Sequence, residues 1–319
     1  MKILIIGAGA LGGYFGARLA HAGQDVTFLL RPRRAQHIAA HGLVVESPAF
    51  GNLTIPAPQV VSRESLAAAP THYDAILVGC KAYDLDDTMD AFASAVGPTT
   101  MIVPLLNGMV HLDRLASRFA PDNVLGGFCL ISAALDDAGR VQHLNDTHQL
   151  VFGERDGRMS ERVLALQACF DDAVCDAIAS PRILSQMWEK WVQIATAAGM
   201  TCLMRASIGT IVSSGGSAFA NALFDECAAV AADAGAALSA ESAARIRAVI
   251  CNPDSAVTAS MMKDLERGAR VEADHLIGAL IRARDAARGS ATQRDGGGAL
   301  ALLDLVLLHL QSYERRFLQ

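Results

Sequence analysis

The chain has 319 residues, of which 52% are hydrophobic, and its formal net charge is −6 at pH 7. This length suits two domains, and an acidic chain without a basic tail argues against nucleic acid as a partner. No uninterrupted apolar run approaches the roughly 20 residues that a membrane span needs. The chain starts with a strand pattern and not with a signal segment, so we expect a cytoplasmic protein with no membrane partner. The seven cysteines are scattered without C-x-x-C spacing, and the nine histidines lack the spacing of metal ligands. We therefore expect reduced thiols and predict no metal site.

A glycine-rich turn directly follows the first apolar run, residues 1–6. The turn has the pattern G-x-G-x-x-G: Gly7, Ala8, Gly9, Ala10, Leu11 and Gly12. An amphipathic helix is predicted behind it, over residues 11–22. In this context the first glycine allows the turn, the second lets backbone N–H groups approach a pyrophosphate, and the third lets the helix pack on the strand. We assign these six residues to a dinucleotide cofactor at the helix N-terminus. The alternative is a structural turn in an ordinary α/β sheet.

The second predicted strand, residues 25–30, ends in basic residues. Its tip is Arg31, followed by Pro32, Arg33 and Arg34, and no carboxylate stands there. NAD sites place Asp or Glu at this tip to bind the ribose 2′-hydroxyl, whereas NADP sites place Arg near the 2′-phosphate. We predict NADP, with Arg31 as the lead contact, because a guanidinium can bind a phosphate with two hydrogen bonds. A solvated basic turn is the alternative.

Strand and helix patterns alternate through the rest of the first half. Further strands are predicted over 43–46 and 52–55 (a hairpin), 75–79, 101–105, 124–131, 141–143 and 149–153, and helices over 33–41, 85–95 and 160–170. This alternation predicts an α/β fold with a Rossmann-type, doubly wound parallel sheet and some antiparallel strands.

Helical periodicity replaces this alternation near residue 181. Helices are predicted over 183–204, 217–235, 239–249, 256–267, 271–288 and 299–316, with a glycine-rich loop over 289–298. We therefore predict an NADP-binding domain over 1–181 and an all-α substrate and catalytic domain over 182–319. The active cleft is expected where the helical domain closes over the carboxyl ends of the strands. The Ala-rich helices within 217–250 and 299–316 could form a homodimer surface, or they could be core.

Polar residues stand where two predicted strands of the first domain end. Lys81 follows the strand 75–79, and Asn107 follows the strand 101–105. Loops at these ends of an open sheet meet the ligand. Asn107 can offer its amide to the nicotinamide ribose or to a substrate, although Asn107-Gly108 could also be a plain turn.

Three polar residues of the helical half are candidates for chemistry. Lys190 shares a helix face with Ile194 and Ala198, so it either extends to water or is held in a cleft. In a cleft it can donate a proton to a carbonyl oxygen as hydride arrives at the carbon. Ser260 lies within the predicted helix 256–267, which Gly268 can end with a left-handed cap. Glu272 then stands at the start of the next helix, where the helix dipole favours a carboxylate. Ser260 could also be an ordinary helix-face residue, and Glu272 an ordinary helix-start charge.

Together these landmarks resemble the ketopantoate reductase (2-dehydropantoate 2-reductase) family over nearly the whole chain. The matching positions are Gly7–Gly12, Arg31, Lys81-Ala82, Asn107-Gly108, Trp188-Glu189-Lys190, Ser260-Met261-Met262-Lys263-Asp264 and Glu272. The resemblance implies that NADPH delivers hydride to the 2-oxo carbon of a small 2-oxo acid. It also implies that Lys190 is the general acid and that Glu272 supports the lysine or the substrate hydroxyls. Ser260 would bind the substrate carboxylate, Asn107 would lie between nicotinamide ribose and substrate, and Lys81 would line the cofactor side.

Three positions depart from the family pattern. The family has asparagines where this chain has Ile194, Ala198 and Val257. Each lost hydrogen bond costs about 0.5–1.5 kcal/mol, so the resemblance favours a more apolar 2-oxo acid than ketopantoate. Ketopantoate stays possible if Thr196 or Gln193 supplies a polar group instead. The remaining alternatives are a different NADP-dependent hydroxyacid or opine-type dehydrogenase, and a non-catalytic NADPH-binding protein.

Overall fold

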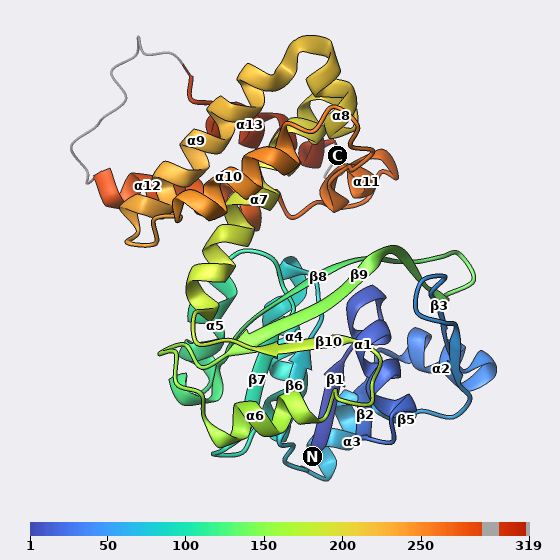
Figure 1. The fold of residues 1–319 in the computed structure, drawn as a ribbon. Helices are drawn as coiled ribbons and strands as arrows, with labels where there is room; N and C mark the ends of the chain where they lie inside the picture. Colours follow the sequence, from blue (N-terminus) through green and yellow to red (C-terminus); the bar gives the residue numbers. More distant parts are fainter. Residues whose placement is uncertain (289–299, 317–319) are drawn as a thin grey trace. The chain divides into compact units, whose positions relative to one another are not determined.

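The computed structural model describes residues 1–288 and 300–316, so the predicted loop 289–298 lies outside the described residues. The chain divides into two compact units (Figure 1). The first unit is Met1–Asn107 with His111–Leu184, and the second is Gly108–Val110 with Ser185–Gln319.

A five-stranded parallel sheet is the centre of the first unit. Its strands are β1 (Lys2–Ile6), β2 (Asp25–Leu29), β5 (Gln59–Val61), β6 (Ala75–Val78) and β7 (Met101–Pro104), in the order β5-β2-β1-β6-β7. The chain winds outward from β1 in both directions, so the predicted doubly wound sheet is confirmed. The central strand β1 is apolar because both of its faces are buried. Ile3 and Ile5 belong to one hydrophobic cluster, and Leu4 is buried on the opposite face.

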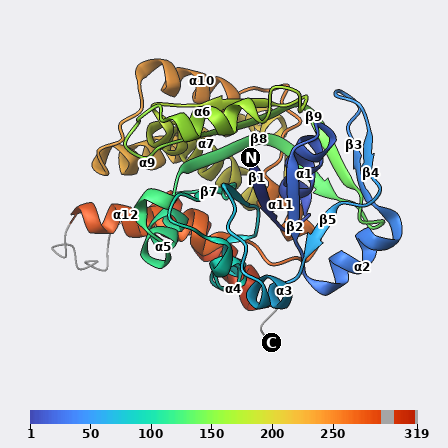
Figure 2. The ribbon, with the colours of Figure 1, turned by 90° about the horizontal axis from the view of Figure 1, so that it is seen from below.

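Six α-helices accompany the strands of this unit. They are α1 (Ala10–His21), α2 (Pro32–His41), α3 (Arg63–Ala68), α4 (Leu85–Phe92), α5 (Val110–Arg118) and α6 (Glu161–Ala168). Short 3₁₀ turns cover Ala82–Asp84, Ala93–Ala95 and Pro121–Asn123. The helix α1 contacts β1 and β2 as well as strands of a second sheet, and Figure 2 shows it between them.

The second sheet is mixed. Its strands are β3 (Leu43–Glu46), β4 (Leu53–Ile55), β8 (Gly126–Leu135), β9 (Val141–Gly153) and β10 (Asp176–Ala179), in the order β10-β9-β3-β4 with β8 on β9. The predicted hairpin is confirmed as the antiparallel pair of β3 and β4. Two predictions need correction. The expected strands 141–143 and 149–153 form one strand, β9, and Val124 pairs with β7 before β8 begins.

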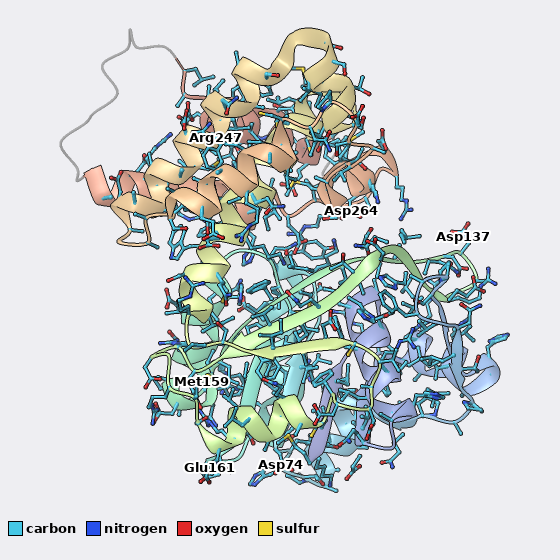
Figure 3. All side chains as sticks on the ribbon, viewed as in Figure 1. Asp74, Asp137, Met159, Glu161, Arg247 and Asp264 are labelled. Atoms are coloured by element: carbon cyan, nitrogen blue, oxygen red, sulfur yellow. The ribbon has the colours of Figure 1, made fainter. Side chains whose placement is uncertain are left out.

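The described part of the second unit contains helices and no strand, which confirms the predicted all-α architecture there. Its α-helices are α7 (Ile183–Met204), α8 (Ile208–Ile211), α9 (Ser217–Asp233), α10 (Ala240–Ile250), α11 (Ser260–Glu266), α12 (Ala279–Arg288) and α13 (Leu302–Arg315). Single π-helical segments cover Val212–Gly216 and Asp274–Gly278. Arg247 of α10 fastens α9 through an ion pair to Asp225 (2.5 Å) and lies 4.3 Å from the ring centre of Phe224 (Figure 3).

The helix predicted over 256–267 is wrong in its first turn, because α11 begins only at Ser260. The carbonyl of Ser255 accepts from Gly209 N–H (2.8 Å), and that of Val257 accepts from Ile208 N–H (3.0 Å). These distant donors hold the segment in a non-helical conformation. The left-handed cap at the other end is confirmed. Gly268 has φ +69°, and the amide after it donates to the Asp264 carbonyl at 2.8 Å.

The apolar faces of α9 and α13 lie mostly in the core of their own unit. Leu223, Phe224 and Val306 are at most 1% exposed and belong to one cluster. Of the two interpretations of these helices, core is therefore the one the structure favours. Within the described part of the chain, no single helix is long and apolar enough to cross a membrane. The segments Ile183–Met204 and Ile208–Asp233 have the length and apolar composition of a membrane span only when taken together, and the chain bends by 67° between them.

Candidate active site

The nucleotide-domain candidates lie where neighbouring parallel strands end. Ile6 at the end of β1 is in register with Leu29 of β2 and Val78 of β6, and Val78 is in register with Pro104 of β7. The segments after these strands therefore leave the same edge of the sheet. They carry the glycine turn, Arg31, Lys81 and Asn107 respectively. The fold thus brings together at one edge the four places that the sequence predicted in this domain.

The glycine turn has the backbone geometry that its pattern predicted. Gly7 adopts φ +82°, and its N–H donates to the Leu29 carbonyl at 3.0 Å. A Cβ on Gly12 would lie 2.2 Å from the Gly7 carbonyl oxygen, so helix and turn touch without room for a side chain. A Cβ on Gly9 would meet nothing within 4 Å. This open space beside a helix N-terminus fits a phosphate group.

Arg31 lies at the N-cap of α2 with its side chain 67% exposed. Its NH2 is 3.3 Å from an Asp84 carboxylate oxygen and 3.4 Å from one of Asp87. These two acids lie more than fifty residues further along the chain, so the sequence near the second strand gave no sign of them. They compete with any phosphate for the guanidinium.

Arg34 makes the contact with the glycine turn that the sequence did not predict. Its Nε donates to the Ala8 carbonyl at 2.9 Å, and its NH1 donates to the Gly139 carbonyl at 2.7 Å. Its position in the basic run Arg31–Arg34 was the available signal, but that run does not say which arginine turns toward the cofactor edge.

Lys81 and Asn107 are both half-buried. Lys81 precedes a 3₁₀ turn, and its carbonyl accepts from Asp84 N–H at 2.9 Å. Asn107 is followed by Gly108, whose φ of +81° confirms that the chain turns there.

In the helical unit, α7 carries Lys190 in a half-buried position. The next residue, Trp191, donates from its indole N–H to the Leu276 carbonyl at 2.9 Å, which ties this part of α7 to the segment after Glu272. Glu272 itself is half-buried and lies just before the helical segment, whose first bond runs from Leu276 N–H to the Glu272 carbonyl at 3.0 Å. The helix predicted from residue 271 therefore begins after Glu272 and opens with a π-helical turn.

Ser260 is exposed at the start of α11. The neighbouring Ala259 N–H donates to the Thr201 hydroxyl on α7 at 3.3 Å. Thr201 is eleven residues beyond Lys190, which is about 16 Å along a helix. The face of α7 from Lys190 to Ala198 therefore runs between the segments that bear Glu272 and Ser260.

The three departures from the family pattern differ in their surroundings. Ala198 is 1% exposed within the helical core, Ile194 is partly buried against that core, and Val257 is 54% exposed. Thr196 is fully buried, and its hydroxyl donates to the Val192 carbonyl at 2.8 Å. Thr196 therefore cannot supply the missing polar group, which corrects one of the two options considered from the sequence.

Among the described residues, no three His, Cys, Asp or Glu side chains gather as metal ligands.

A doubly wound parallel sheet with a glycine turn at its central strand, joined to a helical unit, defines a two-domain dinucleotide-binding protein. Comparison with known families agrees and is more specific. The family described as ketopantoate reductase PanE/ApbA matches residues 3–157, and its C-terminal family matches residues 182–292. The chain belongs to the ketopantoate reductase family.

Individual relatives cover almost the full chain. The Bacillus subtilis protein described as "Uncharacterized oxidoreductase YkpB" is 35% identical over 98% of this chain and 99% of its own. The 2-dehydropantoate 2-reductase of Mesorhizobium japonicum is 27% identical over 88% of this chain and 90% of its own. The crystal structure of the Methylococcus capsulatus 2-dehydropantoate 2-reductase superposes with TM-score 0.86, 29% identity and coverage of 100% and 98%.

The same fold occurs in D-mandelate dehydrogenase, with TM-score 0.83 at 22% identity over 99% of both chains. Family membership identifies the protein as an oxidoreductase that acts on a CH–OH group and implies a nicotinamide cofactor. The residues of the glycine turn fit such a cofactor, because the turn leaves open space where a phosphate would bind.

Proposed function

We propose that the protein reduces a 2-oxo acid to the 2-hydroxy acid with NADPH. The contacts of α7 carry this proposal. The helix holds Lys190 half-buried and is tied on one side to the segment after Glu272 and further along to the start of α11 at Ser260. A cation on α7 and a carboxylate and a hydroxyl on two segments that are bonded to α7 can act on the carbonyl and carboxylate of one small substrate.

Bound NADPH supplies the hydride for the 2-oxo carbon. Lys190 donates a proton to the carbonyl oxygen, since a half-buried ammonium can approach an oxygen on which negative charge develops. Glu272 orients Lys190 or binds a substrate hydroxyl, and Ser260 donates a hydrogen bond to the substrate carboxylate. Asn107, at the carboxyl edge of the parallel sheet, directs its amide to the nicotinamide ribose or the substrate, and Lys81 lines the cofactor side.

The choice of NADPH rests on Arg31 at the tip of β2, where no carboxylate follows the strand. The side chains of Arg31, Asp84 and Asp87 are 67%, 35% and 61% exposed, and ion pairs in contact with water are weak enough for a phosphate dianion to replace them. A protein of the same fold, D-mandelate dehydrogenase, has been solved with NADH and anilino(oxo)acetate, so the fold alone selects neither the cofactor nor ketopantoate.

The preferred substrate is a 2-oxo acid with an apolar side chain. Ile194 and Val257 present hydrocarbon where the family has amides, and Ala198 lies beneath the surface. A diol would leave its hydroxyls without these partners, whereas a branched alkyl chain loses nothing there.

NADPH oxidation with ketopantoate and with branched apolar 2-oxo acids tests the activity. We expect turnover with the apolar acids above that with ketopantoate, and a product reduced at carbon 2. Reduction at carbon 3 or of an imine would identify a different hydroxyacid or an opine-type dehydrogenase. NADPH binding without turnover on any carbonyl would identify a non-catalytic binding protein.

Lys190→Met tests the mechanism. We expect kcat to fall by about 10²–10⁴-fold, the usual contribution of a general acid, with NADPH affinity retained. Arg182→Met removes an exposed cation just before α7 and should leave kcat unchanged. Unchanged turnover in Lys190→Met would refute the assigned role.

We infer a cytoplasmic location because the seven cysteines are scattered along the chain without C-x-x-C spacing, which fits a reducing compartment. A homodimer stays a prediction, to be checked by light scattering. Leu305 and Leu308 of α13, 39% and 56% exposed, are apolar side chains that such a contact could cover.

A further inference from the structure

We propose that Arg34 is a positioning residue of the nucleotide site. Its side chain fixes the orientation of the Ala8–Gly9 peptide, and the phosphates of the bound dinucleotide balance its positive charge. This inference rests on the proposed function only in taking a nicotinamide dinucleotide as the ligand. It concerns binding and not the reduction step.

The geometry of the peptide carries the first step. Arg34 Nε donates to the Ala8 carbonyl at 2.9 Å. The peptide bond is planar and trans, so the Gly9 N–H points opposite to the Ala8 carbonyl. With the carbonyl held toward α2, the Gly9 N–H faces away from α2. A Cβ on Gly9 would meet nothing within 4 Å, so this part of the turn borders open space. Arg34 therefore holds a backbone donor in the orientation in which it can bind a phosphate oxygen.

The second contact explains why an arginine is needed. Arg34 NH1 donates to the Gly139 carbonyl in the turn between β8 and β9 at 2.7 Å. One planar guanidinium thus joins the glycine turn to a turn about 130 residues away. It uses two nitrogens at fixed positions, whereas a lysine ammonium or a side-chain amide would have to reach both carbonyls from one nitrogen. The fit is close, because a Cβ on Gly139 would lie 3.0 Å from Arg34 NH1 and 2.5 Å from His37 Nε2.

The charge of Arg34 points to an anion. Burial lowers the pKa of the guanidinium, its NH2 is enclosed without a hydrogen-bond partner, and its two bonds go to neutral carbonyls. Among the described ion pairs, Arg31 has carboxylates beside it, and Arg34 has none. A partly desolvated cation without a counter-charge is costly in the free protein. A phosphate bound at the adjacent turn would offset that cost without direct contact.

Two roles make different predictions for ligand choice. A residue that fixes the turn at the diphosphate affects the affinity for every ligand that has a diphosphate. A residue that binds the 2′-phosphate affects the affinity for NADPH alone. The enclosure of NH2 favours the first role, because a phosphate oxygen could reach it only after protein atoms move.

Titration calorimetry of the full chain with ADP-ribose, NADH and NADPH tests the inference. In Arg34→Gln we expect all three dissociation constants to rise by one common factor of about 10–100, as for loss of a charge-assisted hydrogen bond. Arg34→Lys keeps the charge and should bind more tightly than Arg34→Gln. The matched control is Arg33→Gln, which removes an exposed cation from the same turn of α2 and should change none of the three.

Thermal melting of the nucleotide-free variants separates binding from folding. A loss confined to NADPH, or equal affinities in wild type and both Arg34 variants, would overturn the inference. If Arg34→Gln fails to fold, Arg34→Lys is compared with wild type instead. A common loss of affinity for ADP-ribose, NADH and NADPH would support the inference, and a loss confined to NADPH, or no loss, would overturn it. Wild-type protein that binds none of the three ligands would contradict the proposed function, and this inference with it, whereas wild-type binding with unaffected variants would contradict this inference alone.

Discussion

Two glycines of the nucleotide turn have opposite surroundings. A Cβ on Gly12 would lie 2.2 Å from the Gly7 carbonyl oxygen and 3.1 Å from Ile5 Cγ2, whereas a Cβ on Gly9 would meet nothing within 4 Å. Gly9 also has φ −77°, which alanine adopts readily. The same substitution should therefore affect stability at one position and ligand binding at the other.

We expect Gly12→Ala to lower the free energy of unfolding by about 1–3 kcal/mol or more, because the methyl group meets backbone that cannot yield cheaply. Gly9→Ala should leave stability nearly unchanged and weaken dinucleotide binding at least tenfold, since the methyl occupies the space left for the diphosphate. Urea unfolding and calorimetry on both variants check this. Tight NADPH binding by Gly9→Ala would place the diphosphate elsewhere.

Cofactor preference should depend on the acids beside Arg31. Asp87 lies 3.4 Å from Arg31 and 2.9 Å from Arg63, with its side chain 61% exposed. Asp87→Asn removes a negative charge near the expected 2′-phosphate, so NADPH should bind several-fold more tightly at low salt while NADH changes little. Asp90→Asn, on the same helix and paired with Arg118, is the control. An equal gain for both cofactors would show that Arg31 does not select the phosphate.

At the scale of elements, a distant side chain caps the last helix. The Glu226 carboxylate on α9 accepts from the Leu302 N–H (2.9 Å) and the Leu303 N–H (3.0 Å) at the start of α13. A carboxylate there satisfies two helix N–H groups and complements the dipole. We expect Glu226→Gln to lower the free energy of unfolding by about 1–2 kcal/mol in urea titrations. Asp233→Asn, at the exposed end of α9, should cause no such loss, and equal losses would argue against the cap.

Local patterns were enough to predict the elements that are buried along their length. The bounds of α7 match the periodic run 183–204, and β1, β2, β6 and β7 match apolar runs. The strand β5 was missed because its three residues are mostly exposed and are held by pairing with β2. The prediction that a helix begins at residue 256 was wrong in its first turn, because the carbonyls of Ser255 and Val257 accept hydrogen bonds from the backbone near residue 208. Tertiary hydrogen bonds overrode local propensity in both segments.

The candidate site divides along the same line. The backbone of the glycine turn could be predicted because its six residues are contiguous and their order dictates the turn. The Arg34 contact with Ala8 and the acids beside Arg31 span 26 residues and more, and no local pattern encodes such proximity. Residue types along a sheet edge are therefore predictable from strand order, whereas their partners are not.

At the scale of the whole molecule, both units contain histidines that resist protonation. In the first unit Tyr14 Oη is hydrogen-bonded to His148 Nδ1 at 2.7 Å, and Phe50 stacks on His148 at 3.5 Å between ring centres. Burial lowers the pKa of His148, with His143 and Arg18 acting in the same direction and Asp176 opposing them. In the second unit burial lowers the pKa of His309 on α13, where Arg205 adds to the effect.

These shifts predict how stability depends on pH. A histidine with a pKa near 6.5 when unfolded takes up a proton that the folded ring binds less well. Its contribution to the free energy of unfolding is fully present above the unfolded pKa and is lost as the pH falls through the lowered folded pKa. We expect the free energy of unfolding to decrease from about pH 7 to about pH 5, before the carboxylates with lowered pKa, such as Glu154 and Asp136, protonate. His148→Gln keeps a polar partner for Tyr14 but does not titrate, so it should flatten this slope. A wild-type slope retained in His148→Gln would show that this histidine is not a source of the acid sensitivity.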